Sequence, residues 1–141
     1  TENGHIITEI HVDLTGLDSA GTTNDVIGLS TGGAAYIGRN VVATNGIIYK
    51  VEMTCLEVPT AGDADVILVA GATGTHAFDA AVGTPTTICD GTGDWTLGKT
   101  ITYTSGITAN HYFYLTQGAT DDATYTAGQF IIRLYGHTVL V

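Results

Sequence analysis

Hydrophobic and polar residues alternate along several short stretches of the chain, with the period of two that is typical of β-strands. In residues 5–14, one side of the predicted strand carries Ile6, Thr8, Ile10, Val12 and Leu14. Further strands are predicted in residues 25–30, 34–39, 100–104, 111–116 and 129–135. Residues 64–70 are nearly all apolar, which predicts a central strand buried on both sides.

A hairpin is predicted where Asn45-Gly46 separates residues 41–44 from residues 47–58. Asn-Gly tolerates positive φ at both positions and therefore suits a type I′ turn. The alternation in the second arm predicts one shared face for Ile47, Tyr49, Val51, Met53 and Cys55. Pro59 is expected to end this strand because proline has no N–H to give to a sheet. Gly128 is expected to mark a bulge or bend before the last strand.

These stretches predict an all-β fold of about eight to ten strands in a single domain. We expect residues 1–141 to form an antiparallel two-sheet β-sandwich of jelly-roll type, with an N-terminal arm over residues 1–7. Residues 71–98 are rich in Gly, Thr, Ala and Asp and are expected to form an extended loop with two short strands. With so few lysines to protect them, long edge strands would be hazardous in a monomer, and covering them in an oligomer is one solution.

Composition supports the β class and excludes some partners. Nineteen glycines and 25 threonines against two prolines favour short strands and turns over helices. Four basic residues face fourteen acidic ones, for a formal net charge of −10, which argues against binding to nucleic acid and to anionic membranes. Only 13% of residues are charged, so Thr, Gly, Ala and Asn must cover much of the surface. This suits a tightly assembled or extracellular protein, and equally an acidic soluble protein adapted to salt.

Candidate chemistry is sparse. No two of the five histidines have the i, i+2 spacing that would direct both imidazoles at one ion from a strand. The calcium candidates are Asp90-Gly91-Thr92-Gly93-Asp94, Asp63-Ala64-Asp65 and Asp121-Asp122. None has the full calcium-loop pattern with its distal Glu, and the alternative is that Asp initiates a turn in each. Serine has no nucleophile motif and the carboxylates show no convergent pair, so the chain is predicted not to be an enzyme and to need no metal or cofactor.

Two further residue groups leave alternatives open. Cys55 and Cys89 are expected to be reduced, although the sequence does not exclude a bridge between them. Tyr112, Phe113 and Tyr114 are consecutive in a predicted strand, where they could stack on a sugar or simply pack in the core.

Three segments of the chain resemble a known family. They are residues 107–116 (Ile-Thr-Ala-Asn-His-Tyr-Phe-Tyr-Leu-Thr), residues 125–136 (Tyr-Thr-Ala-Gly-Gln-Phe-Ile-Ile-Arg-Leu-Tyr-Gly) and, in addition, residues 5–14. These segments resemble small head decoration, or cement, proteins of marine tailed bacteriophages. The resemblance implies a β-sandwich, commonly a homotrimer, that binds the major capsid protein on the outer surface of the virion. Its role would be to clamp neighbouring capsomers against internal pressure. Because residues 1–14 lack the blocks of a signal peptide, synthesis in the host cytoplasm is expected.

In this function, affinity is expected to come from weak contacts multiplied over the lattice. The predicted contact residues are His5, Ile6 and Ile7, in the N-terminal arm. One alternative is a receptor-binding or carbohydrate-binding jelly-roll domain of a phage fibre or spike, with Trp95 and Tyr112 exposed to the ligand. Another is a subunit of a secreted bacterial filament or surface layer.

Overall fold

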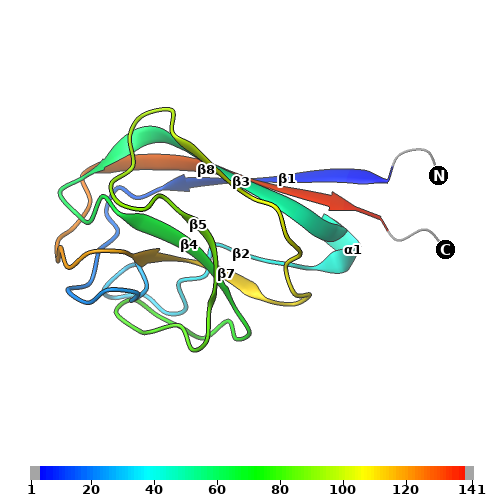
Figure 1. Cartoon of the computed structure of the whole chain (residues 1–141). Helices are drawn as coiled ribbons and strands as arrows, with labels where there is room; N and C mark the ends of the chain where they lie inside the picture. Colours follow the sequence, from blue (N-terminus) through cyan, green and yellow to red (C-terminus); the bar gives the residue numbers. More distant parts are fainter. Residues whose placement is uncertain (1–3, 139–141) are drawn as a thin grey trace.

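The computed structural model describes residues 4–138, which contain eight strands and one short helix in two packed sheets (Figure 1). The first sheet has the order β1 (His5–Asp13), β8 (Ala127–His137), β3 (Ile47–Thr60) and β6 (Thr100–Tyr103). The second has the order β2 (Gly38–Arg39), β7 (Tyr112–Gln117), β4 (Val66–Gly71) and β5 (Thr86–Asp90). All neighbouring strands are antiparallel. The predicted all-β, two-sheet sandwich is confirmed.

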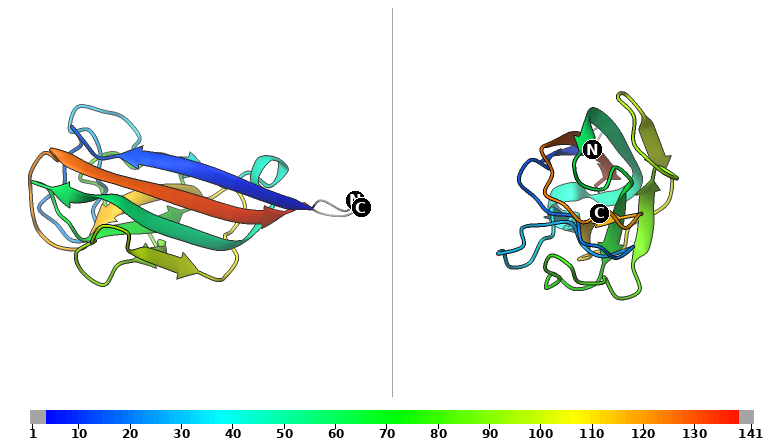
Figure 2. Two further views of the ribbon diagram at one scale, coloured as in Figure 1. Left: turned by 90° about the horizontal axis from the view of Figure 1, so that it is seen from above. Right: turned by 90° about the vertical axis from the view of Figure 1, so that its left-hand side faces the viewer.

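Strands that pair are mostly far apart in the sequence. The first strand pairs with the last, β2 with β7, β3 with β6 and β4 with β5, and the pairs β3–β8 and β4–β7 complete the two sheets. The start of β1 and the end of β8 therefore lie side by side at one end of the sandwich (Figure 1). Seen from above, β1 forms one margin of its sheet, next to β8 and then β3 (Figure 2).

The core lies between the two sheets, where large side chains from both inner faces meet. Its fully buried members include Met53, Phe130 and Ile132 from the first sheet and Leu68 and Phe113 from the second. A smaller cluster covers the outer face of the second sheet, where loop residues pack on β4 and β7. Every residue of β4 is consequently buried, as its continuous apolar run predicts.

The predicted Asn45-Gly46 hairpin is wrong. Residues Val42–Asn45 form a single helical turn, α1, and Ile47 at the start of β3 pairs with β8 instead of residues 41–44. Two bonds of the buried Asn45 side chain explain the difference: Oδ1 accepts the Val41 N–H at 2.8 Å, and Nδ2 donates to Thr8 Oγ1 at 2.9 Å. The side chain thus closes the helical turn and anchors it to β1, while Gly46, at φ 70° and ψ −168°, leaves the helix in a conformation that glycine adopts readily.

Pro59 does not end β3, which continues to Thr60. The register against β8 shifts between Glu57 and Thr60, so this part of the ladder is irregular and tolerates a residue that has no N–H. Gly128, predicted to mark a bulge or bend, lies opposite this irregular part of the ladder. Its φ is 136°, and its N–H donates to Glu57 Oε2 at 3.1 Å.

The two short strands predicted in residues 25–30 and 34–39 reduce to β2 and isolated bridges, such as Val26 to Thr116. These segments follow the margin of β7 through single hydrogen bonds, including Ile27 N–H to Leu115 O at 2.9 Å and Ile37 N–H to Phe113 O at 2.8 Å. They are separated by turns, which prevents a continuous ladder.

Candidate interaction surface

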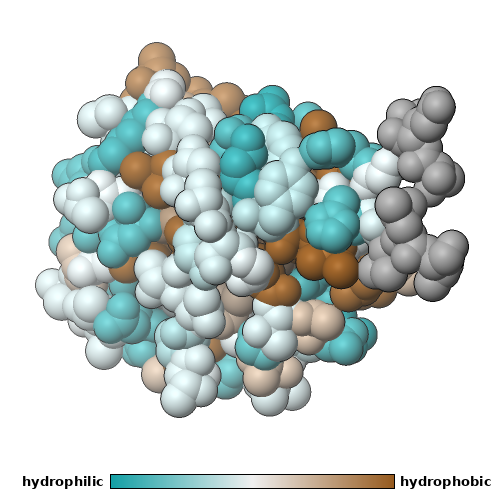
Figure 3. Space-filling model, turned by 45° about the vertical axis from the view of Figure 1, so that its right-hand side comes forward, coloured by the Kyte–Doolittle hydropathy of each residue, from teal (hydrophilic) through white to brown (hydrophobic). Residues whose placement is uncertain are grey.

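Exposed hydrophobic side chains gather at the end of the sandwich where β1 begins and β8 ends. Ile7 is 55% exposed, Ile47 is 43% exposed, and Tyr49 and Val42 are each 39% exposed. Ile7 comes from β1, Ile47 and Tyr49 from β3, and Val42 from α1. We call these four residues, together with His5 and His137, the chain-end surface; hydrophobic colour is visible at this end, beside the grey residues (Figure 3).

A bulge in β3 places two of these residues outside. The register against β8 shifts between Ile48 and Lys50, which inserts one extra residue into β3. Ile48 is therefore buried while Tyr49 is exposed, and the alternation resumes with Val51 inside. The predicted common face of Ile47, Tyr49 and Val51 is wrong, because simple alternation does not reveal a bulge.

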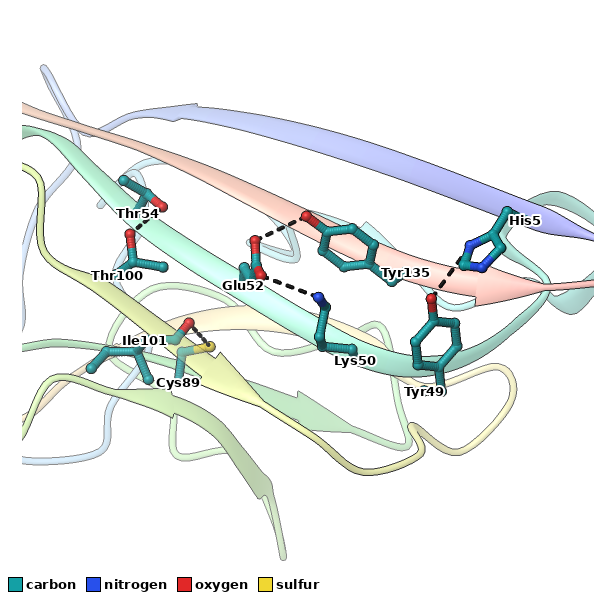
Figure 4. Close-up of polar contacts among 9 residues, drawn as sticks. All are labelled: His5, Tyr49, Lys50, Glu52, Thr54, Cys89, Thr100, Ile101 and Tyr135. Carbon is teal, nitrogen blue, oxygen red and sulfur yellow. Dashed lines mark hydrogen bonds and ion pairs between the residues drawn. The ribbon is translucent and has the colours of Figure 1, made fainter.

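The pairing of β1 with β8 brings two histidines together. His5 lies directly opposite His137, and Tyr49 contacts both rings, with centroid separations of 5.8 Å to His5 and 6.3 Å to His137. A hydrogen bond of 3.3 Å joins the Tyr49 hydroxyl to His5 Nδ1 (Figure 4). Sequence reasoning missed this cluster because it considered spacing along one strand, whereas these residues meet across three.

Charges next to the chain-end surface are compensated within the sheet. The Tyr135 hydroxyl donates to Glu52 Oε2 at 2.9 Å, and Lys50 Nζ lies 3.3 Å from Glu52 Oε1 (Figure 4). Lys50 Nζ also lies 4.1 Å from the centroid of the Tyr135 ring. The Tyr135 hydrogen bond, followed by Lys50, lowers the pKa of Glu52. Farther along, Arg133 forms an ion pair of 3.2 Å with Glu9, so both cations on this face have acidic partners.

The predicted contact residues belong to β1. His5, Ile6 and Ile7 pair with His137, Gly136 and Tyr135 of β8 and are thus part of the sandwich. Ile6 points between the sheets and is half-buried, whereas the side chains of His5 and Ile7 are exposed. Residues 1–3 of the predicted arm lie outside the described residues.

A second exposed feature is an apolar groove of about 250 Å³ between the margin of β7 and the loop that precedes β2. Its walls include Leu17, Ile27, Leu29, Tyr36 and Leu115. At its rim the Tyr36 ring meets the Tyr112 ring edge to face at 4.9 Å, and the Arg39 guanidinium lies 5.0 Å from the centroid of Tyr112.

The structure corrects the aromatic candidates for sugar binding. Trp95 is only 1% exposed, and its Nε1–H donates to the Val66 carbonyl at 2.6 Å. Phe113 and Tyr114 are also buried, so Tyr112 alone of the predicted aromatic residues reaches the surface. Trp95 is a core residue and has no face available for a ligand.

The remaining polar candidates are the two cysteines and the clustered aspartates. Cys55 and Cys89 are free, as predicted, and both are buried. Burial raises the pKa of the Cys89 thiol to about 12. Burial and then the nearby carboxylates of Asp63 and Asp90 raise the pKa of Asp65. Within residues 4–138, no group of three or more His, Cys, Asp or Glu side chains is arranged to hold a metal ion.

Comparison with protein-family models, curated protein sequences and solved structures finds no match. No helix in the described part of the chain is long and apolar enough to cross a membrane.

Proposed function

We propose that this chain is a structural protein of a virion that binds the outer surface of the capsid and reinforces the shell by bridging neighbouring capsomers. The observation that carries this proposal is the chain-end surface, where the predicted contacts His5 and Ile7 lie at the same end of the sheet as Ile47 and Tyr49. Hydrophobic residues exposed on a rigid sheet suit binding to another protein, because their conformations are already fixed by the strands.

The strand order supports a specific version of the fold. We propose a jelly roll, in which a long antiparallel ribbon is wrapped into two sheets. The orders β1-β8-β3-β6 and β2-β7-β4-β5, with the first strand paired to the last and β4 to β5, are those expected of that wrapping. Jelly rolls occur in viral shells and also in lectins, so this topology agrees with the capsid proposal but does not distinguish capsid binding from carbohydrate binding.

Charge and resemblance suggest the partners. The formal net charge of −10 would keep the protein away from packaged DNA and leave the major capsid protein as its partner. The resemblance to cement proteins implies a homotrimer on the outer capsid surface of the virion, without catalysis. Many copies on one lattice would give strong attachment from weak individual contacts.

The test is to locate and count this chain in its native particle by electron microscopy and quantitative mass spectrometry. A capsid cement protein would appear over the shell in proportion to the capsomers, whereas a fibre or spike protein would appear in few copies at the tail or vertices. Finding this chain only at the tail, or not finding it in purified particles, would contradict the proposal.

Binding to capsids depleted of the chain provides the second measurement. Deleting residues 1–7 would remove part of β1, so side-chain replacements that retain the strand are the better variants. The double variant Ile7→Glu, Tyr49→Glu should bind capsids at least tenfold more weakly than wild type. The control is Leu97→Glu, which should bind like wild type because Leu97 is 71% exposed and lies outside the chain-end surface. Equal binding by all three proteins would remove the chain-end surface from the proposal.

A receptor-binding domain of a fibre or spike is the second candidate. The pair Tyr36 and Tyr112 beside the apolar groove supports it, since exposed aromatic rings with a nearby cation can bind an uncharged or sugar ligand. Glycan-array binding that is lost in Tyr36→Ala would favour this candidate. An array without signal would weaken it.

A further inference from the structure

The edge of β1 is long and regular. Its nine residues pair with β8 without a register shift, and β1 is the last strand of its sheet. The other outer strands of the two sheets are shorter, at four residues in β6, two in β2 and five in β5. Strand β1 contains no Pro, Lys or bulge, which are three of the devices that keep an edge from pairing with another chain.

Flanking hydrogen bonds show which backbone groups face this open edge. Leu14 N–H donates to Gly128 O at 2.8 Å, and Thr138 N–H donates to Gly4 O at 2.6 Å. Both bonds involve even-numbered residues that flank β1, and in an antiparallel ladder the direction of the backbone groups alternates with each residue. The N–H and C=O groups of the odd-numbered residues therefore face the open edge, at His5, Ile7, Glu9, His11 and Asp13.

We propose that β1 of a second copy of this chain pairs antiparallel with this edge, about a two-fold axis at Ile10. On the outer face, Glu9 would then lie opposite His11 of the partner subunit, and by symmetry His11 opposite the partner's Glu9. On the inner face, Ile10 would meet the partner's Ile10, and Thr8 would meet the partner's Val12. Backbone groups of residues 7, 9, 11 and 13 supply the hydrogen bonds. The four-stranded sheet that contains β1 in each copy then joins its counterpart in one continuous sheet of eight strands.

Side-chain charge and the length of the paired segment together favour this register. Because facing residues must lie on the same side of the sheet, the axis moves only in whole-residue steps along β1. An axis at Glu9 opposes two Glu9 carboxylates, and an axis at His11 places Glu9 opposite the partner's Asp13. An axis at Thr8 loses the Glu9 to His11 pair and sets His5 against the partner's His11. The axis at Ile10 gives two carboxylate–imidazole pairs without opposed like charges and pairs residues 7–13. Axes at Ile7 and Val12 also give two such pairs, but they pair only residues 5–9 and 11–13 of β1.

Burial points to the same edge. Ile6, Thr8 and Ile10 point between the sheets, yet each is only partly buried, whereas the equivalent residues of the central strands β3 and β8 are buried. A neighbouring strand would cover these side chains, which adds hydrophobic stabilisation to the backbone hydrogen bonds. The contact is a two-fold one, separate from the three-fold association that the resemblance implies, and it does not depend on capsid binding.

Proline substitution tests the pairing with a matched control. His11→Pro removes an N–H that faces the open edge and has no hydrogen-bond acceptor within residues 4–138, so the sandwich should fold while the dimer is blocked. His5→Pro removes the same kind of N–H outside the paired residues 7–13. Sedimentation equilibrium should show a concentration-dependent dimer for wild type and for His5→Pro. The dimer dissociation constant of His11→Pro should be at least tenfold higher.

Circular dichroism of each variant checks that the fold is retained. If His11→Pro does not fold, His11→Glu replaces it as the test variant. The new carboxylate at position 11 would lie opposite the partner's Glu9 and should weaken the dimer at least tenfold. Wild type that remains monomeric up to about 1 mM would overturn the proposal and leave the edge for an extended segment of another protein. An unchanged oligomer in the His11 variants would also overturn it, and loss of the dimer in His5→Pro would overturn the register.

Discussion

The side chain of Trp95 offers the sharpest test of the packing between the sheets. It is 1% exposed, donates from Nε1 to the Val66 carbonyl at 2.6 Å, and meets the Phe130 ring edge to face at 5.1 Å. The substitution Trp95→Phe retains an aromatic ring at this position but removes the donor and part of the ring volume. We expect a protein that folds with reduced stability.

Two losses determine the size of the effect. The Val66 carbonyl loses a buried hydrogen bond, which costs about 1–3 kcal/mol. The volume removed is roughly 40 Å³, and at about 24 cal/mol per Å³ of cavity it adds about 1 kcal/mol. The edge-to-face contact with Phe130 is largely retained. The free energy of unfolding should therefore fall by about 2–4 kcal/mol.

Urea denaturation followed by far-ultraviolet circular dichroism measures this change. Fluorescence is unsuitable because Trp95 is the single tryptophan of the chain. The control is Leu97→Ala, two residues away and 71% exposed, which should change stability by less than about 0.5 kcal/mol. A loss below about 1 kcal/mol in Trp95→Phe, or an equal loss in the control, would refute the assignment of Trp95 to the core.

Three other measurements test separate features. Gly136→Ala should lower the free energy of unfolding by about 1–3 kcal/mol, because the added Cβ would overlap the last carbonyl of α1. Gly83→Ala is the control and should leave stability unchanged, since a Cβ at that position would meet open space. Equal effects of the two substitutions would contradict this packing. The thiols of Cys55 and Cys89 should react with a disulfide reagent only after denaturation, since both are buried, and rapid reaction of the folded protein would contradict their burial. Burial and neighbouring carboxylates raise the pKa of Asp65, so its ionised form destabilises the fold; this cost develops as the pH rises from the unfolded-state pKa through the folded-state pKa. Asp65→Asn should therefore be more stable than wild type at pH 7, with a difference that shrinks as the pH falls below both values, and a difference independent of pH would contradict this cause.

Alternation along the chain was sufficient to predict most of the strands. Strands β1, β4, β6, β7 and β8 lie where the pattern predicts them, because a strand with one buried face must alternate and one with two buried faces must be apolar. The pattern failed where a local side-chain contact competed with it. At Asn45, bonds to Val41 and Thr8 favour a helical turn over the hairpin that Asn-Gly predicts.

Only part of the candidate surface was predictable. His5 and Ile7 were predicted to contact a partner because of their place near the start of the chain, and both side chains are exposed in the structure. Ile47 and Tyr49 were missed because the bulge in β3 reverses the alternation for two residues. Proximity of His5 to His137 depends on which strands pair, and no spacing within either segment reveals it.

The sequence by itself determined the β class, the apolar run of β4 and the acidic, charge-poor surface, because these follow from residue types and from periodicity along neighbouring positions. Tertiary structure alone decided that β1 pairs with β8 and lies at an edge, that Trp95 is inside and that Tyr49 is outside. The physical reason is that strand order, register and bulges are set by how two sheets fill one core together. That packing depends on contacts between residues more than a hundred positions apart, as for His5 and His137.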